Sequence, residues 1–184
     1  EARKAAPVDP RVAIDTLDDA LAMWRGPALA DVAERSLLAE AARLDELRLE
    51  AQEERVGALL AIGDASRAIG DLEPLVGRYP LRERLWEQLM LALYRDGRQA
   101  DALAAFQRAR EVLADELGID PSPELARLQA QILGQDAVLE LRGEPLRGYR
   151  LLEKLGESAV ATRFRAIQPR VERDVEIEIV HEHL

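Results

Sequence analysis

The sequence contains no cysteine, few aromatic residues and no apolar run of about 18 residues, the length that a membrane-spanning helix requires. Without cysteine there is no disulfide bond, thiolate nucleophile or cysteine-based zinc site, which fits a reducing cytosol. The first ten residues, EARKAAPVDP, lack the apolar core of a signal peptide. We therefore expect a cytoplasmic protein without a transmembrane segment.

Charged residues and helix formers are abundant instead. Of the 184 residues, 33% are charged and 48% are hydrophobic, and alanine, leucine, glutamate and arginine dominate, which favours a helical globular body. The formal net charge of −10 opposes contact with nucleic acid phosphates, so we expect a protein partner or a neighbouring domain of the same chain. Because the chain begins at Glu1 and stops on a strand-like run, we expect a piece of a longer protein.

Two helices are predicted near the N-terminus. Asp9 and Pro10 have the pattern of a helix cap followed by proline in the first turn, and Gly26 with Pro27 would end that helix. Its predicted apolar face consists of Val12, Leu17, Ala20, Leu21 and Trp24. A long helix is predicted over 36–62, with an apolar stripe of Leu37, Leu44, Leu47, Val56, Leu59 and Leu60.

A repeat of 34 residues follows and resembles the tetratricopeptide pattern. The spacing relates four pairs of residues, namely Leu59 and Leu93, Gly63 and Gly97, Ala68 and Ala102, and Leu72 and Phe106. The small alanines allow paired helices to approach closely, and the glycines permit tight turns between them. The first copy departs from the pattern at Gln52, where a large apolar residue is usual, and Pro74 predicts a kink within a helix.

The C-terminal part changes character after Pro145. Before it, Gly118 is predicted to end one helix, and Ser122 with Pro123 to begin another that ends near Gly134. Beyond it, apolar and polar residues alternate, which predicts three antiparallel strands at 149–156, 160–167 and 173–180. We therefore expect a mainly α fold, a tetratricopeptide-like array with a short C-terminal β segment, divided into a helical domain at 1–134, a linker at 135–147 and a tail at 148–184.

Two motifs stand out in the helical region, PLRERLWEQLMLALY (80–94) and LGIDPSPEL (117–125). Chiefly through these motifs, residues 8–134 resemble the bacterial transcriptional activation domain, the helical domain found beside the DNA-binding domain of SARP-type activators. The resemblance implies a tetratricopeptide-like array that makes protein–protein contacts and regulates transcription. Family members normally have a winged-helix DNA-binding domain before this region, so we assign DNA contact to none of these residues.

The tail resembles the first three strands of the small lobe of a Ser/Thr protein kinase. In such a lobe, a G-x-G-x-x-G-x-V loop and the lysine of V-A-I-K bind the ATP phosphates. Within LGESAVATRFRA, Gly156 matches the first glycine, but Ser158 and Ala161 replace the others. Glu178 stands at the lysine position, where its charge would repel phosphate. We therefore expect a degenerate, pseudokinase-like tail that binds no nucleotide.

Four side chains in and around the second repeat are candidates for a partner-binding groove: Arg84, Tyr94, Arg98 and Arg108. Arginines on one surface would suit an acidic segment of a partner. The alternative is a solvated face in which the arginines of this region pair with Glu83, Glu87 and Asp101.

Other sites receive less support from the sequence. His181 and His183 could share one face of a strand and bind a metal, but no third ligand is apparent and a solvated chain end explains them. No catalytic triad, paired-carboxylate pocket or P-loop is recognisable, so we expect a non-enzymatic regulatory protein without a cofactor or metal. The alternative function is the regulatory part of a nucleotide-sensing kinase or pseudokinase, and an exposed β edge could also pair two copies of the chain.

Overall fold

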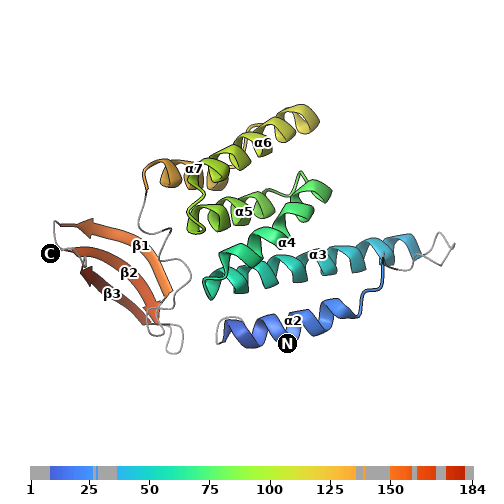
Figure 1. Ribbon diagram of the computed structural model, residues 1–184, viewed down its shortest axis with the longest axis horizontal. Coiled ribbons are helices and arrows are strands. Elements are labelled where there is room, and N and C mark those ends of the chain that lie inside the picture. Colours follow the sequence, from blue (N-terminus) through green and yellow to red (C-terminus); the bar gives the residue numbers. More distant parts are fainter. Residues whose placement is uncertain are drawn as a thin grey trace.

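The computed structural model describes residues 9–26, 28, 37–135, 139, 150–158, 161–168 and 173–180. The fold is mainly α, with a short antiparallel sheet at one side of the helices (Figure 1). The described helices are α2 (Pro10–Ala22), α3 (Leu38–Ala61), α4 (Ala65–Arg78), α5 (Glu83–Arg95), α6 (Gln99–Leu117) and α7 (Pro123–Leu133). The predicted fold class is therefore confirmed.

The helices stack in chain order, so that each packs mainly on its sequence neighbour (Figure 1). Helix α7 closes the stack against both α5 and α6. Tight turns join α3 to α4 and α5 to α6, and the glycines at their centres, Gly63 and Gly97, have φ angles of 79° and 77°. A side chain is strained in this left-handed region, which explains why glycine occurs at both turns.

The predicted repeat is present as two helix pairs, α3 with α4 and α5 with α6. All the apolar positions that the spacing of 34 relates are buried: Leu59, Ala68 and Leu72 in the first pair, and Leu93, Ala102 and Phe106 in the second. Since both alanines are fully buried, the helices of each pair approach closely at these points, as the sequence predicts.

The buried faces of the first two helices differ from the predicted ones. In α2, Val12 is 48% exposed, whereas Ala13 and Ile14 are buried together with Leu17. The helix ends at Ala22, before the predicted Gly26, although Asp9 caps its start as expected. Helix α2 packs on α3, and its buried face is centred on Ala13, Ile14 and Leu17, so Val12, the residue before Ala13, lies outside that face.

Helix α3 buries residues only from Leu49 onward, in its C-terminal half. Leu47 is 41% exposed, while Leu49 and the charged Glu53 are buried. The reason is that α3 contacts α2, α4 and α5, so its C-terminal half is enclosed on several sides. One apolar stripe along the whole helix was therefore the wrong expectation.

Three strands form the sheet: β1 (Arg150–Glu157), β2 (Ala161–Gln168) and β3 (Arg173–Val180). They are antiparallel in the order β1-β2-β3, within one residue of the predicted bounds. Along β3, Val175 and Ile177 are half-buried and Glu176 and Glu178 are exposed, so these four residues follow the predicted alternation.

One residue within the predicted linker belongs to the helical core. Leu139 is fully buried and lies in the same apolar cluster as the helices. Its carbonyl accepts a hydrogen bond of 2.8 Å from Arg95 Nε, and Arg95 Nη1 donates one of 3.1 Å to the Leu60 carbonyl. Arg95 thus connects the end of α5 to α3 and to Leu139.

Candidate protein-binding surface

The four predicted groove residues lie on α5, on α6 and in the turn between them. Arg84 is exposed in the first turn of α5 and lies 3.6 Å from the carboxylate of Glu53 and 3.7 Å from that of Glu54 on α3. Tyr94 is half-buried near the end of the same helix and packs against the core. Arg98 occupies the position before the first residue of α6, where its side chain makes no capping hydrogen bond, and it forms an ion pair of 2.7 Å with Asp101.

Arg108 lies on α6 with its guanidinium over the ring of Trp86, 5.5 Å from the centroid. Trp86 itself is buried, and its indole N–H donates to the Pro80 carbonyl at 2.8 Å. Arg98 lies ten residues before Arg108 along α6, about 15 Å away along the helix axis. The structure therefore brings Arg108, in the middle of α6, to Trp86 on α5 and places Arg98 at the start of α6.

A buried carboxylate on α3 binds Arg82, the residue just before α5. Glu53 is 2% exposed and accepts a hydrogen bond of 2.7 Å from Arg82, which also pairs with Glu46 at 2.9 Å. The hydrogen bond to Glu53 is the main reason that the pKa of Arg82 is raised. Arg82 and Arg84, at the start of the second repeat, thus pair with Glu53 on α3 in the first repeat. The sequence does not predict these pairs, because the partners lie about 30 residues apart.

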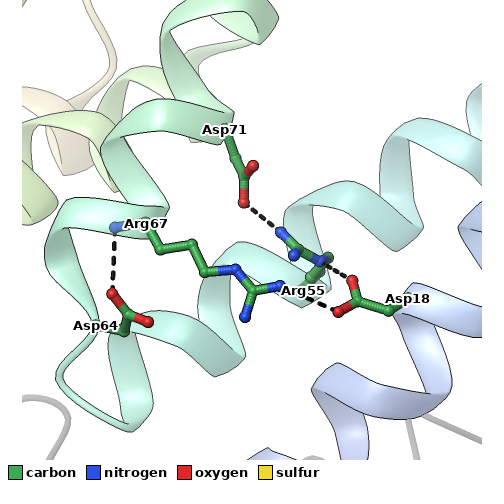
Figure 2. Close-up of polar contacts among 5 residues, drawn as sticks. All are labelled: Asp18, Arg55, Asp64, Arg67 and Asp71. Carbon is green, nitrogen blue, oxygen red and sulfur yellow. Dashed lines mark hydrogen bonds and ion pairs between the residues drawn. The ribbon is translucent and has the colours of Figure 1, made fainter.

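A second charged cluster joins α2, α3 and α4 (Figure 2). The guanidinium of Arg55 on α3 bonds the carboxylates of Asp18 on α2 and Asp71 on α4. Asp18 also accepts from Arg67 at 3.2 Å, and Asp64 caps α4 by accepting from the Arg67 backbone N–H. The cluster therefore links three consecutive helices through one arginine.

The electrostatics of this cluster favour the charged forms. Burial disfavours the ionised Asp18 carboxylate, but the hydrogen bonds and charges of Arg55 and Arg67 outweigh it and lower the pKa of Asp18. Burial likewise opposes the charge on Arg55, and the two carboxylates nevertheless raise its pKa. The sequence did not predict this cluster, since Asp18, Arg55 and Asp71 lie far apart in the chain.

Next to this cluster lies a cleft of about 410 Å³. It is bounded by Asp18 and Leu21 from α2, by Gln52, Arg55 and Val56 from α3, and by Gly70, Asp71, Pro74, Leu75 and Arg78 from α4. Three of these residues, Gly70, Pro74 and Arg78, are exposed, so the mouth of the cleft is at the surface. The sequence marks the cleft only through Gln52, the departure from the repeat pattern.

The stretch that resembles a glycine-rich loop forms the β1–β2 hairpin. Gly156 pairs with Arg163 across the two strands. The hydroxyl of Ser158 accepts from the Ala161 N–H at 3.1 Å, and the Ser158 N–H donates to the Ala161 carbonyl at 2.8 Å. The serine that replaces a glycine thus closes the turn itself, and Glu178 pairs with Arg163 from the other side.

His181 and His183 lie outside the described residues. Within the described residues, no group of histidine and acidic side chains could hold a metal ion. No helix in the same part of the chain is long and apolar enough to cross a membrane.

The helical region matches a known family. Residues 1–133 match the family model described as the bacterial transcriptional activator domain. The regulator RedD of Streptomyces coelicolor is 47% identical over 136 residues, covering 73% of this chain and 39% of RedD. The regulatory protein AfsR of Streptomyces griseus is 46% identical over 140 residues, covering 76% of this chain and 14% of AfsR.

A solved structure of a similar protein covers nearly the whole chain. It is EmbR of Mycobacterium tuberculosis in complex with a low affinity phosphopeptide, with a TM-score of 0.70 and 25% sequence identity. The match covers 98% of this chain and 64% of the EmbR chain. The fold and the motifs thus define a helical domain of bacterial transcriptional regulators.

The chain belongs to the bacterial transcriptional activator domain family and is part of a SARP-type transcriptional regulator. It spans well under half the length of RedD and AfsR.

Proposed function

We propose that the helical array is a non-catalytic module that binds a protein partner or another domain of the same regulator, and that it acts in transcription control by this contact. The observation that carries the proposal is the position of Arg108. Its guanidinium is exposed over the buried Trp86 and pairs with no carboxylate among the described residues. A cation held by an aromatic ring is ready to meet an acidic side chain of a partner.

Among the other predicted residues, Arg84 supports a surface of the same character. Arg84 is 55% exposed, and its carboxylate contacts of 3.6 and 3.7 Å are long, so a partner's carboxylate could displace them. The relative EmbR has been solved with a phosphopeptide, and a peptide partner is consistent with the surface proposed here.

Capture from a lysate of the source bacterium tests this function. The wild-type chain is compared with the double variant Arg98→Glu and Arg108→Glu, and bound proteins are quantified by mass spectrometry. We expect the double variant to lose the partners that the wild type captures. The matched control reverses two exposed arginines elsewhere, Arg110→Glu and Arg127→Glu, and should retain them. Equal capture by wild type and the first double variant would contradict the proposed surface.

We further propose that the C-terminal sheet is a kinase-like small-lobe segment that binds no nucleotide. Two observations support this. The Ser158 hydroxyl closes the hairpin where a phosphate-binding loop needs an open backbone, and an acidic residue, Glu178, stands opposite Arg163 in the register of β2 and β3. Calorimetric titration with Mg²⁺-ATP should give no heat of binding. Saturable binding in the micromolar range would favour the nucleotide-sensing alternative.

A further inference from the structure

We propose that the cleft between α2, α3 and α4 binds an aromatic side chain of a protein segment that carries an acidic residue beside it. This inference rests on the proposed protein-binding function and deepens it, because it assigns a second contact, on the first repeat, and the chemistry of what enters it.

The internal repeat indicates what the cleft lacks. Moving back 34 residues from Trp86 leads to Gln52, and from Arg108 to Pro74. In the second repeat, Trp86 of α5 is 4% exposed, and Arg108 of α6 lies over its ring. In the first repeat, Gln52 and Pro74 both line the cleft. The cleft is therefore the tryptophan position of the first repeat, without its tryptophan.

The walls of the cleft suit a flat apolar ring. Leu21, Val56 and Leu75 supply aliphatic surface from three helices, and Pro74 adds a rigid ring at the mouth. The volume of about 410 Å³ lies within the range of ligand sites, roughly 300–1,000 Å³. Buried aromatic anchors of this kind dominate the energetics of protein interfaces.

The cleft also offers hydrogen-bond acceptors to a ring N–H. Proline has no backbone N–H, so Pro74 cannot donate to the carbonyl of Gly70, its partner position one turn earlier in α4. Both residues line the cleft, and Gly70 is exposed. The side-chain amide of Gln52 makes no hydrogen bond within the described part of the chain. In the second repeat the Trp86 N–H also finds a carbonyl, that of Pro80.

The charged residues that line the cleft indicate which kind of residue lies next to the partner's aromatic side chain. Asp18 and Asp71 both line the cleft and both pair with Arg55, which lines it too. Arg78 lines the cleft, lies 5.4 Å from the centroid of the Tyr79 ring and has no carboxylate partner among the described residues. Its positive charge at the mouth favours an acidic residue next to the aromatic anchor.

The test is a titration of the full 184-residue chain, labelled with ¹⁵N, with a capped ten-residue peptide whose centre is Asp-Trp-Asp. We expect saturable amide shifts at Gly70, Asp71 and Gln52, and no such shifts with a peptide in which alanine replaces the tryptophan. If the tryptophan peptide causes no saturable shift at these amides, the proposal is overturned.

Two variants locate the contact. In the Gln52→Trp variant, the new side chain should fill the cleft and raise the melting temperature of the chain. The affinity for the peptide should fall by about tenfold or more. Gln129→Trp on α7 is the matched control and should leave peptide binding unchanged. If Gln52→Trp lowers the melting temperature, or binds the peptide as well as wild type, the vacant-position argument is wrong.

The charge is tested separately from the ring. Arg78→Glu should lower the affinity for the peptide several-fold, whereas Arg110→Glu on α6 should leave it unchanged. Equal affinities of the two variants for the peptide would overturn the role of Arg78. If a Gln52→Trp variant captures every partner that the wild type captures from a lysate, the cleft is not a binding site, but the proposed protein-binding function stands. A wild-type chain that captures no partner would count against the proposed function itself.

Discussion

Arg55 holds three helices together through one side chain. Its side chain is 13% exposed, and its guanidinium meets the carboxylates of Asp18 on α2 and Asp71 on α4, whose side chains both remain more than a third exposed (Figure 2). Water screens such half-exposed carboxylates, but the arginine itself has little access to water and depends on them. Because α2 packs on the array chiefly through α3, this cluster adds a polar link from α2 towards α4.

Replacing Arg55 by methionine should lower the free energy of unfolding by about 2 kcal/mol, less than for a fully buried pair. Methionine keeps part of the apolar stem and leaves Asp18 and Asp71 as neighbouring like charges. Chemical denaturation monitored by circular dichroism measures the loss. Arg43→Met is the control, because its pair with Glu40 is exposed, and its midpoint should match wild type. Equal losses in both variants would contradict a special role for Arg55.

The pKa of Glu87 on α5 is raised, whereas that of Asp18 is lowered. Burial raises the pKa of the Glu87 carboxyl, and the charges of Glu83 and Glu124 add to the shift. A carboxyl with a raised folded-state pKa binds its proton more tightly when folded. Stability therefore falls as pH rises from the ordinary pKa through the folded-state pKa, and Glu87 is a cost at neutral pH.

Glu87→Gln should therefore stabilise the chain at pH 7 by about 0.5 kcal/mol, the scale of a relieved like-charge pair. The gain should shrink as the pH is lowered through the raised pKa, since the wild-type carboxyl then becomes neutral too. Denaturation midpoints of both proteins at several pH values between 4 and 7 measure it. A gain that is constant with pH would show that charge is not its cause.

At the scale of the element, the sequence predicted helix caps and turns but not which side chains are buried by packing between helices. The caps Asp9 and Ser122 and the turn glycine Gly97 have the predicted roles, because each depends on residues within one turn of the chain. The outward Val12 and the buried Glu53 were missed, because their environment is set by helices distant in sequence.

The same limit applies to the candidate site. The repeat spacing identified Gln52 as unusual, but the sequence did not reveal a cleft there, since α2 contributes a wall of it. Arg98 pairs with Asp101, as one of the two alternatives from the sequence held. Arg82 and Arg84 instead reach carboxylates on α3, about 30 residues earlier, which no local pattern encodes.

Two glycine-to-alanine substitutions should shift stability in opposite directions. Gly97→Ala should lose about 1 kcal/mol, because an alanine at a φ of 77° is strained. Gly77→Ala, on the exposed surface of α4 with no atom near its added methyl group, should gain roughly 0.5–1 kcal/mol from better helix propensity. Thermal melts of both variants check the signs. A loss for both would mean that α4 does not tolerate the methyl group near Pro74.

At the scale of the whole molecule, the helices form a chain of neighbour contacts, whereas each strand makes its main contacts with another strand. Such an array loses its cooperativity at its ends first, because a terminal helix has only one neighbour. Helix α7 is protected by packing on both α5 and α6. Leu139 adds to this end of the array, since its side chain enters the core and its carbonyl receives Arg95.

The boundary of the helical domain follows from this contact. A fragment of residues 1–134 would lose Leu139 and leave Arg95 Nε without its acceptor, whereas a fragment of residues 1–147 keeps both. We expect the shorter fragment to be less stable by roughly 2–5 kcal/mol, the usual cost of removing a buried leucine. Leu139→Ala in the longer fragment should reproduce most of that loss in chemical denaturation. If both fragments unfold at the same denaturant concentration, the array ends at 134 and Leu139 is not part of its cooperative unit.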